Sequence, residues 1–168
     1  MPLTLADGRH KVAVLTTKPA DLSAITVTEL TAGINAAPKI NKPDYRLSPT
    51  ASDTVPDQPL SQEGNATTFG NSNFEGSITV LRFLDDQGQP EVAEDELWDA
   101  MKEKGTRLWI VDREGPKEGT AWTTGDEYEV FEIITDLPQK PTDMAGYIKR
   151  PIPLGVQNYV RGAVAAGA

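Results

Sequence analysis

The chain has 168 residues, enough for one domain with its own core, and its lack of cysteine excludes disulfide bonds, thiolate catalysis and cysteine-ligated zinc. The single histidine, His10, lies between Arg9 and Lys11 and is interpreted as a solvated polar residue. We therefore expect neither a histidine-based triad nor a multi-histidine metal site. The net charge of −9 repels nucleic acid from the average surface, which argues against a conventional DNA-binding domain.

The first part of the chain predicts an arm, a strand and a long loop. Residues 1–10 lack the basic and apolar regions of a signal peptide and are interpreted as an N-terminal arm of a protein kept in the cytoplasm. The run KVAVLT at 11–16 is short and β-branched, which predicts a strand, whereas residues 26–40 are ambiguous. Residues 41–73 contain four prolines and two glycines and predict a long loop with room for brief strands. The sizeable apolar residues of this loop, our candidates for contacts between subunits, are Tyr45, Leu47, Val55, Leu60 and Phe69.

The middle of the chain predicts a long strand and then a helix. In the run FEGSITVLRFL at 74–84, alternation places Phe74, Ile78 and Val80 on one face and Glu75 on the other. Residues 92–104 have acidic residues at the beginning and lysines followed by Gly105 at the end, as expected for a helix. We expect the apolar stripe of this helix to pack it against the strands through Leu97, Trp98 and Met101.

The last part predicts three more strands. The runs TRLWIVD at 106–112 and EYEVFEIIT at 127–135 predict a hairpin with an extended connection. Residues 147–156 predict a strand, which Pro151 and Pro153 would confine to an edge or to an arm on a partner. Residues 157–168 are interpreted as a C-terminal tail. The sum is a single mainly β domain, a sandwich or barrel flanked by one helix, with a long loop and terminal arms.

Charge is distributed unevenly along the chain. Residues 85–103 hold eight acidic residues and one base, Lys102, and residues 126–136 hold five acidic residues and no base. Both ends of the chain are basic, with Lys140, Lys149, Arg150 and Arg161 opposed only by Asp143 after Leu137. In a homo-oligomer this asymmetry would favour contacts between basic arms and acidic bodies, although taken alone it is better explained as solvated surface charge.

The residues that would suit catalysis or sugar binding have simpler interpretations. Glu127, Glu129 and Glu132 are the best acid–base candidates for a hydrolase, yet on an apolar strand a solvated or channel-facing role is favoured. Trp109 and Trp122 could form a carbohydrate-binding platform, but Trp109 lies in an apolar run typical of a core. The sequence holds no nucleotide-binding or zinc-hydrolase motif, so we expect no enzyme activity and no cofactor.

Three stretches carry a resemblance to a known family: TVTELTAGINAA at 26–37, LSPTASDTVPDQPLSQEGNATTFGNSNFEGSITVLRFLD at 47–85 and EDELWDAMKEKGTRLWIVDREG at 94–115. In combination they resemble the major tail proteins of actinobacterial siphophages, and IKRPIPLGVQNYV at 148–160 is similar to the closing strand of that family. The resemblance implies a β-sandwich or barrel flanked by one helix, assembled as hexameric rings around a wide channel. It further implies that one sheet of each subunit lines the channel, while the long loop and the chain ends bridge rings.

A structural virion protein is therefore the leading hypothesis, assembled in the bacterial cytoplasm into a phage tail. Its expected partners are further copies of itself and the tape-measure, tail-terminator and baseplate proteins, while viral DNA passes without specific binding and no membrane is involved. An acidic lining would repel DNA and speed its transit, which makes Glu75, Glu127 and Glu129 the candidates for the channel wall. The alternatives are a neck or tail-terminator protein that forms a single ring, and a carbohydrate-binding module.

Overall fold

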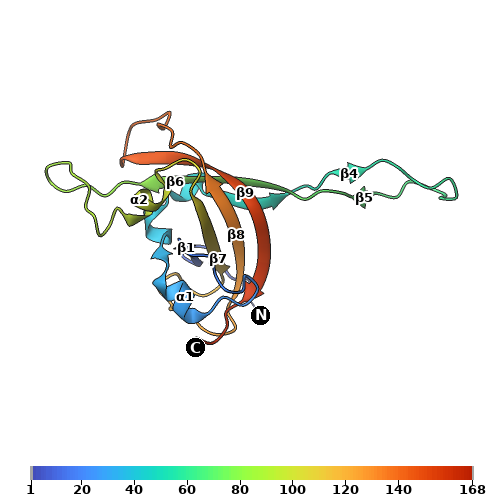
Figure 1. Cartoon of the computed structure of the whole chain (residues 1–168), viewed down its shortest axis with the longest axis horizontal. Helices are drawn as coiled ribbons and strands as arrows, with labels where there is room; N and C mark the ends of the chain where they lie inside the picture. The colour runs from blue at the N-terminus through green and yellow to red at the C-terminus, as the bar shows by residue number, and fades with distance from the viewer. Residues whose placement is uncertain (1, 168) are drawn as a thin grey trace.

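The computed structural model describes residues 2–167, and the main body is one curled antiparallel sheet (Figure 1). Its seven strands follow the order β2-β1-β7-β8-β9-β6-β3, and the mainly β class predicted from the sequence is confirmed. The strands are β1 (His10–Leu15), β2 (Ile34–Asn35), β3 (Arg46–Thr50), β6 (Asn73–Leu81), β7 (Arg107–Glu114), β8 (Glu127–Thr135) and β9 (Lys149–Ala163). Two further strands, β4 (Thr54–Val55) and β5 (Thr68–Phe69), pair only with each other.

The sheet curls around one core, so that strands from its two ends face each other. The buried side chains of this inner core include Val14 from β1 at one end of the sheet, Phe131 from β8 at its middle and Leu47 from β3 at the other end. The hydroxyl of Tyr45, just before β3, donates to Asp112 on β7 at 2.9 Å and ties the two ends together. The result is the predicted sandwich or open barrel, with β2 and β3 as its free edges.

Strand β9 is central and not at an edge, contrary to the prediction from Pro151 and Pro153. Its first residues pair with β6 and the remainder pair with β8, with a bulge opposite Glu132 and Ile133. The carbonyls of Pro151 and Pro153 accept from Gln139 and Asp136, on the side away from β6. The N–H and C=O groups of one strand residue point to the same side of the strand. The N–H groups that the two prolines lack would therefore have pointed away from β6, and the hydrogen bonds between β9 and β6 are intact.

The chain ends are more ordered than predicted. Residues 157–163, interpreted as the beginning of a tail, complete β9. The following residues are anchored by a hydrogen bond from the Val27 amide to the Ala165 carbonyl. The predicted N-terminal arm is free of helix and strand from residue 2 to residue 9. Met1 and Ala168, the outermost residues of the two predicted arms, lie outside the described residues.

The described residues include two α-helices where the sequence predicted one. Helix α1 (Val27–Ala32) lies in the region that was ambiguous and begins with a capping box, in which Thr26 and Glu29 exchange hydrogen bonds. Helix α2 (Glu96–Met101) is shorter than the predicted 92–104 because residues 92–95 form turns and residues 102–104 form a bend and a turn. Two 3₁₀ turns, Ala37–Lys39 and Lys42–Asp44, lead into β3.

A second core lies on the opposite face of β1, β7 and β8. Leu30 of α1 and Ile25 cover this face together with Val164. Trp109 and Trp122 are buried here, with 6% and 8% of their surfaces exposed. The burial rules out the sugar platform that an exposed pair of indole rings would have offered.

Candidate functional site

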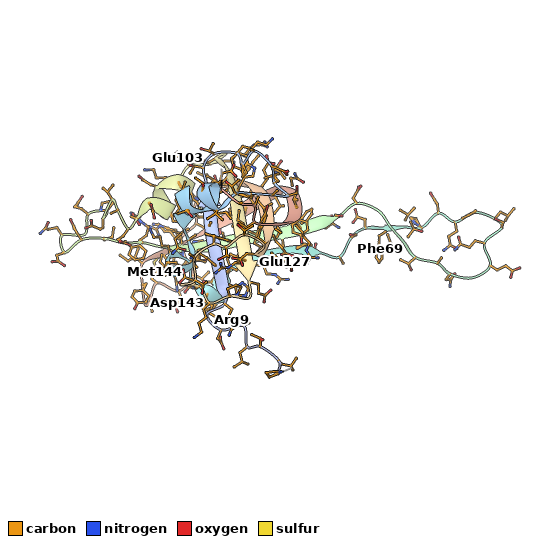
Figure 2. The ribbon with its side chains drawn as sticks, turned by 90° about the horizontal axis from the view of Figure 1, so that it is seen from below. Arg9, Phe69, Glu103, Glu127, Asp143 and Met144 are labelled. Atoms are coloured by element: carbon orange, nitrogen blue, oxygen red, sulfur yellow. The ribbon has the colours of Figure 1, made fainter. Side chains whose placement is uncertain are left out.

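A long hairpin, here called the arm (residues 51–72), projects from the body between β3 and β6 (Figure 1). It contributes no side chain to either core, and all four residues of its short strands β4 and β5 are exposed. Leu60 is fully exposed and Phe69 is 70% exposed, and Figure 2 shows Phe69 on the arm, far from the body. A segment so poor in contacts does not offset its own ordering entropy, which suits a surface that a partner completes.

The structure separates the five apolar residues proposed for contacts between subunits. Leu47 belongs to the inner core with 8% exposed, and Tyr45 packs against that core while bonding to Asp112. Both therefore stabilise the body, because the strand β3 inside the predicted loop turns them inward. Val55, Leu60 and Phe69 are left exposed on the arm.

A group of acidic side chains lies at the end of the sheet where β7, β8 and the end of β9 meet. Asp112, Glu114, Glu127 and Glu129 line an open hollow of about 500 Å³ with Arg161. His10 of β1 lies beside it, with Nδ1 3.3 Å from Asp112 and Nε2 3.6 Å from Glu114. With 46% of its side chain exposed, His10 is solvated as predicted, and its ring also lies between two carboxylates at the rim of the hollow.

Tyrosine hydroxyls partner two of these carboxylates from the core side. Tyr159 donates to Glu129 at 2.8 Å, and burial together with this carboxylate raises the pKa of Tyr159 to about 12. Burial also raises the pKa of Asp112, against the opposing effects of hydrogen bonds from Tyr45 and His10. A carboxyl group that is harder to ionise in the folded chain than in the unfolded chain destabilises the fold once it is ionised.

We expect Asp112→Asn to raise the unfolding temperature at about pH 7 and to have a smaller effect at about pH 4. A carboxyl group whose pKa is raised by folding keeps its full contribution to stability below its pKa in the unfolded chain. That contribution is lost as pH rises through its pKa in the folded chain. Asparagine cannot ionise, so the substitution removes a destabilisation that exists only at the higher pH. The amide oxygen of asparagine still accepts from Tyr45. Thermal unfolding at both pH values measures the effect, and an equal or larger gain at low pH would contradict this reasoning.

Glu75 lies on the other face of the sheet from Glu127 and Glu129. Its neighbours Phe74 and Gly76 turn toward the inner core, so Glu75 points outward and forms an ion pair with Arg46 of β3. Glu129 shares its face with the fully buried Phe131, on the concave side of the sheet. The three glutamates proposed for the channel wall therefore do not share a surface.

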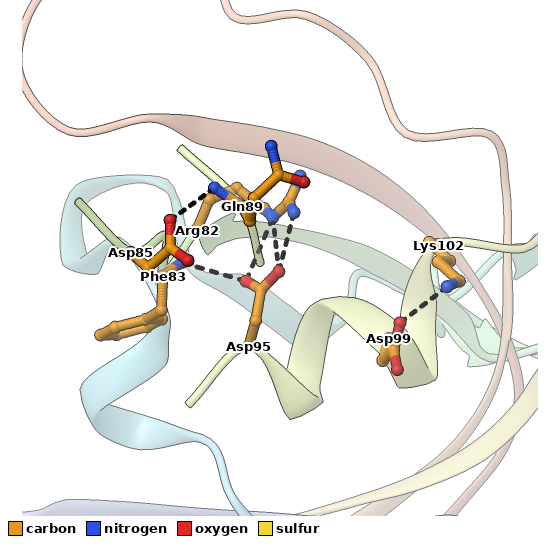
Figure 3. Close-up of polar contacts among 7 residues, drawn as sticks. All are labelled: Arg82, Phe83, Asp85, Gln89, Asp95, Asp99 and Lys102. Carbon is orange, nitrogen blue, oxygen red and sulfur yellow. Dashed lines mark hydrogen bonds and ion pairs between the residues drawn. The ribbon is translucent and has the colours of Figure 1, made fainter. Parts of the chain in front are cut away.

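A second projection, residues 85–94, leaves the body at the other end of β6. Asp95 anchors the base of this projection (Figure 3). Its carboxylate accepts hydrogen bonds from Nε and Nη2 of Arg82 and from the amide of Phe83. Within the projection, Asp85 accepts a hydrogen bond from the amide of Gln89. The guanidinium of Arg82 also lies 4.5 Å from the ring centre of Trp98. Of the three residues expected to pack the helix, Leu97 and Met101 are buried in the inner core and Trp98 is half-buried beneath this arginine.

The described residues give no support to a hydrolase or to a metal centre. Glu132 forms an ion pair with Arg107 on the face opposite Glu129 and is not directed at the acidic hollow. Among residues 2–167, no cluster of three or more histidine, aspartate or glutamate side chains is placed to hold a metal ion. Within the same range, no helix has the length and apolar character needed to cross a membrane.

Comparison with known proteins identifies the family. No curated protein matches the sequence. The family model described as phage tail tube protein matches residues 1–168, the whole chain. The curled sheet with free edges and a long arm fits a subunit built for contacts with further copies. The chain therefore belongs to the phage tail tube protein family and has a structural role in the tail tube of a phage virion.

Proposed function

We propose that copies of the chain assemble through sheet-to-sheet contacts into stacked hexameric rings, and that these rings form the channel for viral DNA. The match of the whole chain to the tail tube family carries this proposal. In it the protein is a structural component of the siphophage tail and has no enzymatic activity.

The free edges of the sheet supply the surfaces for closing a ring. β3 pairs only with β6, and β2 covers only two residues of β1, so both ends of the sheet present unpaired backbone groups. Pairing β3 of one copy with the β1–β2 edge of the next would use two different surfaces. Such a heterologous contact closes into a ring when the rotation between copies allows it.

The outer face of β3, β6 and β9 is the best candidate for the channel wall. It carries Glu75 and Ser77, and neither core covers the side chain of Glu75. The concave face that carries Glu127 and Glu129 is filled by the inner core up to the rim of the acidic hollow. We therefore assign Glu75 to the wall and place Glu127 and Glu129 near an end of the subunit, where rings would meet.

The proposed partners are the proteins that a tail tube would contact in a phage tail. The tube would surround the tape-measure protein, end at a tail-terminator protein and begin at the baseplate, while DNA passes without specific binding. The net charge of −9 supports such passage because it offers DNA no attractive surface on average. The runner-up is a neck or tail-terminator protein, which would form one ring without polymerising.

Electron microscopy of the purified protein at increasing concentration tests the proposal. Open tubes of stacked rings are the expected result. Single rings at every concentration would favour the neck or terminator role, and monomers throughout, with no copies in the tails of the parent virion, would overturn both. Averaging of the tubes also gives the number of subunits in each ring.

Phage carrying Glu75→Lys should form tails but eject their genomes more slowly, on the order of tenfold. Each ring would then present a circle of lysines that hold the DNA backbone. The comparison variant is Glu127→Lys/Glu129→Lys, which places lysines on the concave side and should impair ejection less. Ejection is followed by release of a DNA-bound dye, after microscopy has verified intact tails. A larger defect in the double variant would reverse the assignment of the two faces.

A further inference from the structure

Two surface features lie at opposite ends of β6. The arm enters β6 at Asn73, and residues 137–150, here called the receiving segment, join the other end, where Leu81 pairs with Lys149. The amide of Arg82 donates to the carbonyl of Ile148 and continues this junction. Figure 1 shows the two features projecting on opposite sides, and Figure 2 places Phe69 and Met144 far apart. They are therefore unable to meet within one copy.

The arm is both apolar and acidic. Val55, Leu60 and Phe69 are exposed along it. Its charged residues are Asp53, Asp57 and Glu63, with no lysine or arginine between residues 51 and 72. Across the described part of the chain, none of these three carboxylates forms an ion pair.

The receiving segment has the complementary character. Its exposed apolar residues are Leu137, Met144, Tyr147 and Ile148, with 55–81% of their surfaces accessible. Its bases are Lys140, Lys149 and Arg150, opposed only by Asp143, and within residues 2–167 none of the three bases forms an ion pair. Lys149 also borders an open hollow of about 370 Å³ between this segment and the outer face of β6.

Charge distinguishes the receiving segment from the other projection at the same end of β6. Residues 85–94 carry Asp85, Asp86, Glu91 and Glu94 and no base, so they repel an acidic arm. The exposed Val92 gives that projection an apolar residue but no charge complementarity. Only one of the two projections therefore offers both properties that the arm requires.

We propose that the arm of one copy docks on the receiving segment of a second copy, displaced from the first along the direction of β6. This inference rests on the proposed function, since it names the surface that receives the arm within the tube. The two surfaces differ, so each copy that receives one arm offers its own arm to a further copy. Such a contact repeats along a filament without closing on itself.

Charge reversal on the receiving segment tests the contact. Lys140→Glu/Lys149→Glu should raise the concentration needed for tube formation about tenfold, because two ion pairs become repulsive. Adding Asp57→Lys/Glu63→Lys on the arm of the same protein should restore assembly. The matched control is Lys18→Glu/Lys117→Glu, which changes the net charge equally at two exposed lysines outside the receiving segment and should assemble like the wild type.

The absence of cysteine allows a second measurement that does not depend on charge. Leu60→Cys protein and Tyr147→Cys protein are mixed, assembled and treated with a bifunctional maleimide, which should join different copies. Val92→Cys in place of Tyr147→Cys is the control and should give little product.

The outcomes separate this inference from the proposed function. Normal tubes from Lys140→Glu/Lys149→Glu, or loss of assembly that the arm reversal does not restore, would overturn the receiving segment while tubes from the wild type leave the proposed function standing. If the charge variants fail to fold, cross-linking decides, and equal yields from Tyr147→Cys and Val92→Cys would overturn the contact. A wild-type protein that forms no tubes would overturn the proposed function itself.

Discussion

Replacement of residues 54–69 by an Asn-Gly turn should abolish tube assembly without lowering the thermal stability of the body. The amide of Gly70 donates to the carbonyl of Asp53 at 2.7 Å, and the amide of Asp53 donates to Asn71 at 2.9 Å. The two sides of the hairpin are therefore already adjacent, and an Asn-Gly turn suits a tight connection between antiparallel strands. Neither core loses a side chain, so the body keeps its packing.

Two measurements check this result. Sedimentation of assembled material should fall to the background level for the shortened protein, while its unfolding temperature stays within about 2 °C of the wild type, which corresponds to a change in stability of at most about 1 kcal/mol. Assembly at the wild-type level would show that the arm is dispensable for polymerisation. A large drop in unfolding temperature would instead assign the arm to the stability of the body.

A point substitution separates the apolar contacts of the arm from its mere presence. Phe69→Ser should weaken assembly, whereas Val92→Ser should not, although the two side chains are comparably exposed at 70% and 79%. Brief proteolysis of the free subunit should cut first within the arm, and assembly should protect it. Equal sensitivity in subunit and tube would mean that the arm stays free in the assembly.

Local sequence patterns predicted the strands whose side chains alternate clearly. The runs that became β1, β6, β7 and β8 differ from their predicted bounds only at the ends, and the β7–β8 hairpin is confirmed. Helix α1 was missed although the capping-box pattern Thr-x-x-Glu at Thr26 and Glu29 was available as a signal. A helix of six residues has too short an apolar stripe to be recognised by periodicity.

The features that escaped prediction depend on contacts between distant parts of the chain. Alternation showed that Glu75 lies opposite Ile78, but only the curl of the sheet reveals which face the inner core fills. The proline-containing run was expected at an edge because proline lacks the N–H group that a neighbouring strand requires. Whether that missing group faces a neighbour depends on the register of β9 with β6, which local sequence does not show. Leu47 was assigned to the long loop because its burial requires pairing of β3 with β6, which is likewise non-local.

The β7–β8 connection is held by a buried arginine that sequence patterns did not reveal. Arg113 is fully buried, and its Nη1 donates to Asp126 at 2.8 Å and to the carbonyl of Ala121 at 3.0 Å. Its Nη2 donates to the carbonyls of Lys117 and Thr120. The guanidinium also lies 5.0 Å from the ring centre of Trp122, so one side chain organises most of the loop between the two strands.

Arg113→Ala should lower the free energy of unfolding by about 3–5 kcal/mol, the usual cost of breaking a buried ion pair by removing one partner. The substitution leaves Asp126, only 17% exposed, without its charged partner and with the Thr123 amide as its remaining donor, and it removes the arginine donor from three carbonyls. Arg107→Ala is the matched control, because Arg107 lies on the same face of β7 and pairs with Glu132 but is 51% exposed. We expect that control to cost about 0–1 kcal/mol.

Urea denaturation measures both variants, and amide hydrogen exchange locates the change. Exchange should accelerate first between residues 115 and 126 in Arg113→Ala, since that loop loses the four hydrogen bonds that the guanidinium donates to it, while β1 stays protected until global unfolding. The loop contains Trp122, which belongs to the second core, so loosening of the loop would also expose that core to water. Equal costs for Arg113→Ala and Arg107→Ala would mean that the loop holds its conformation without the arginine and that the buried hydrogen bonds add little beyond a surface pair.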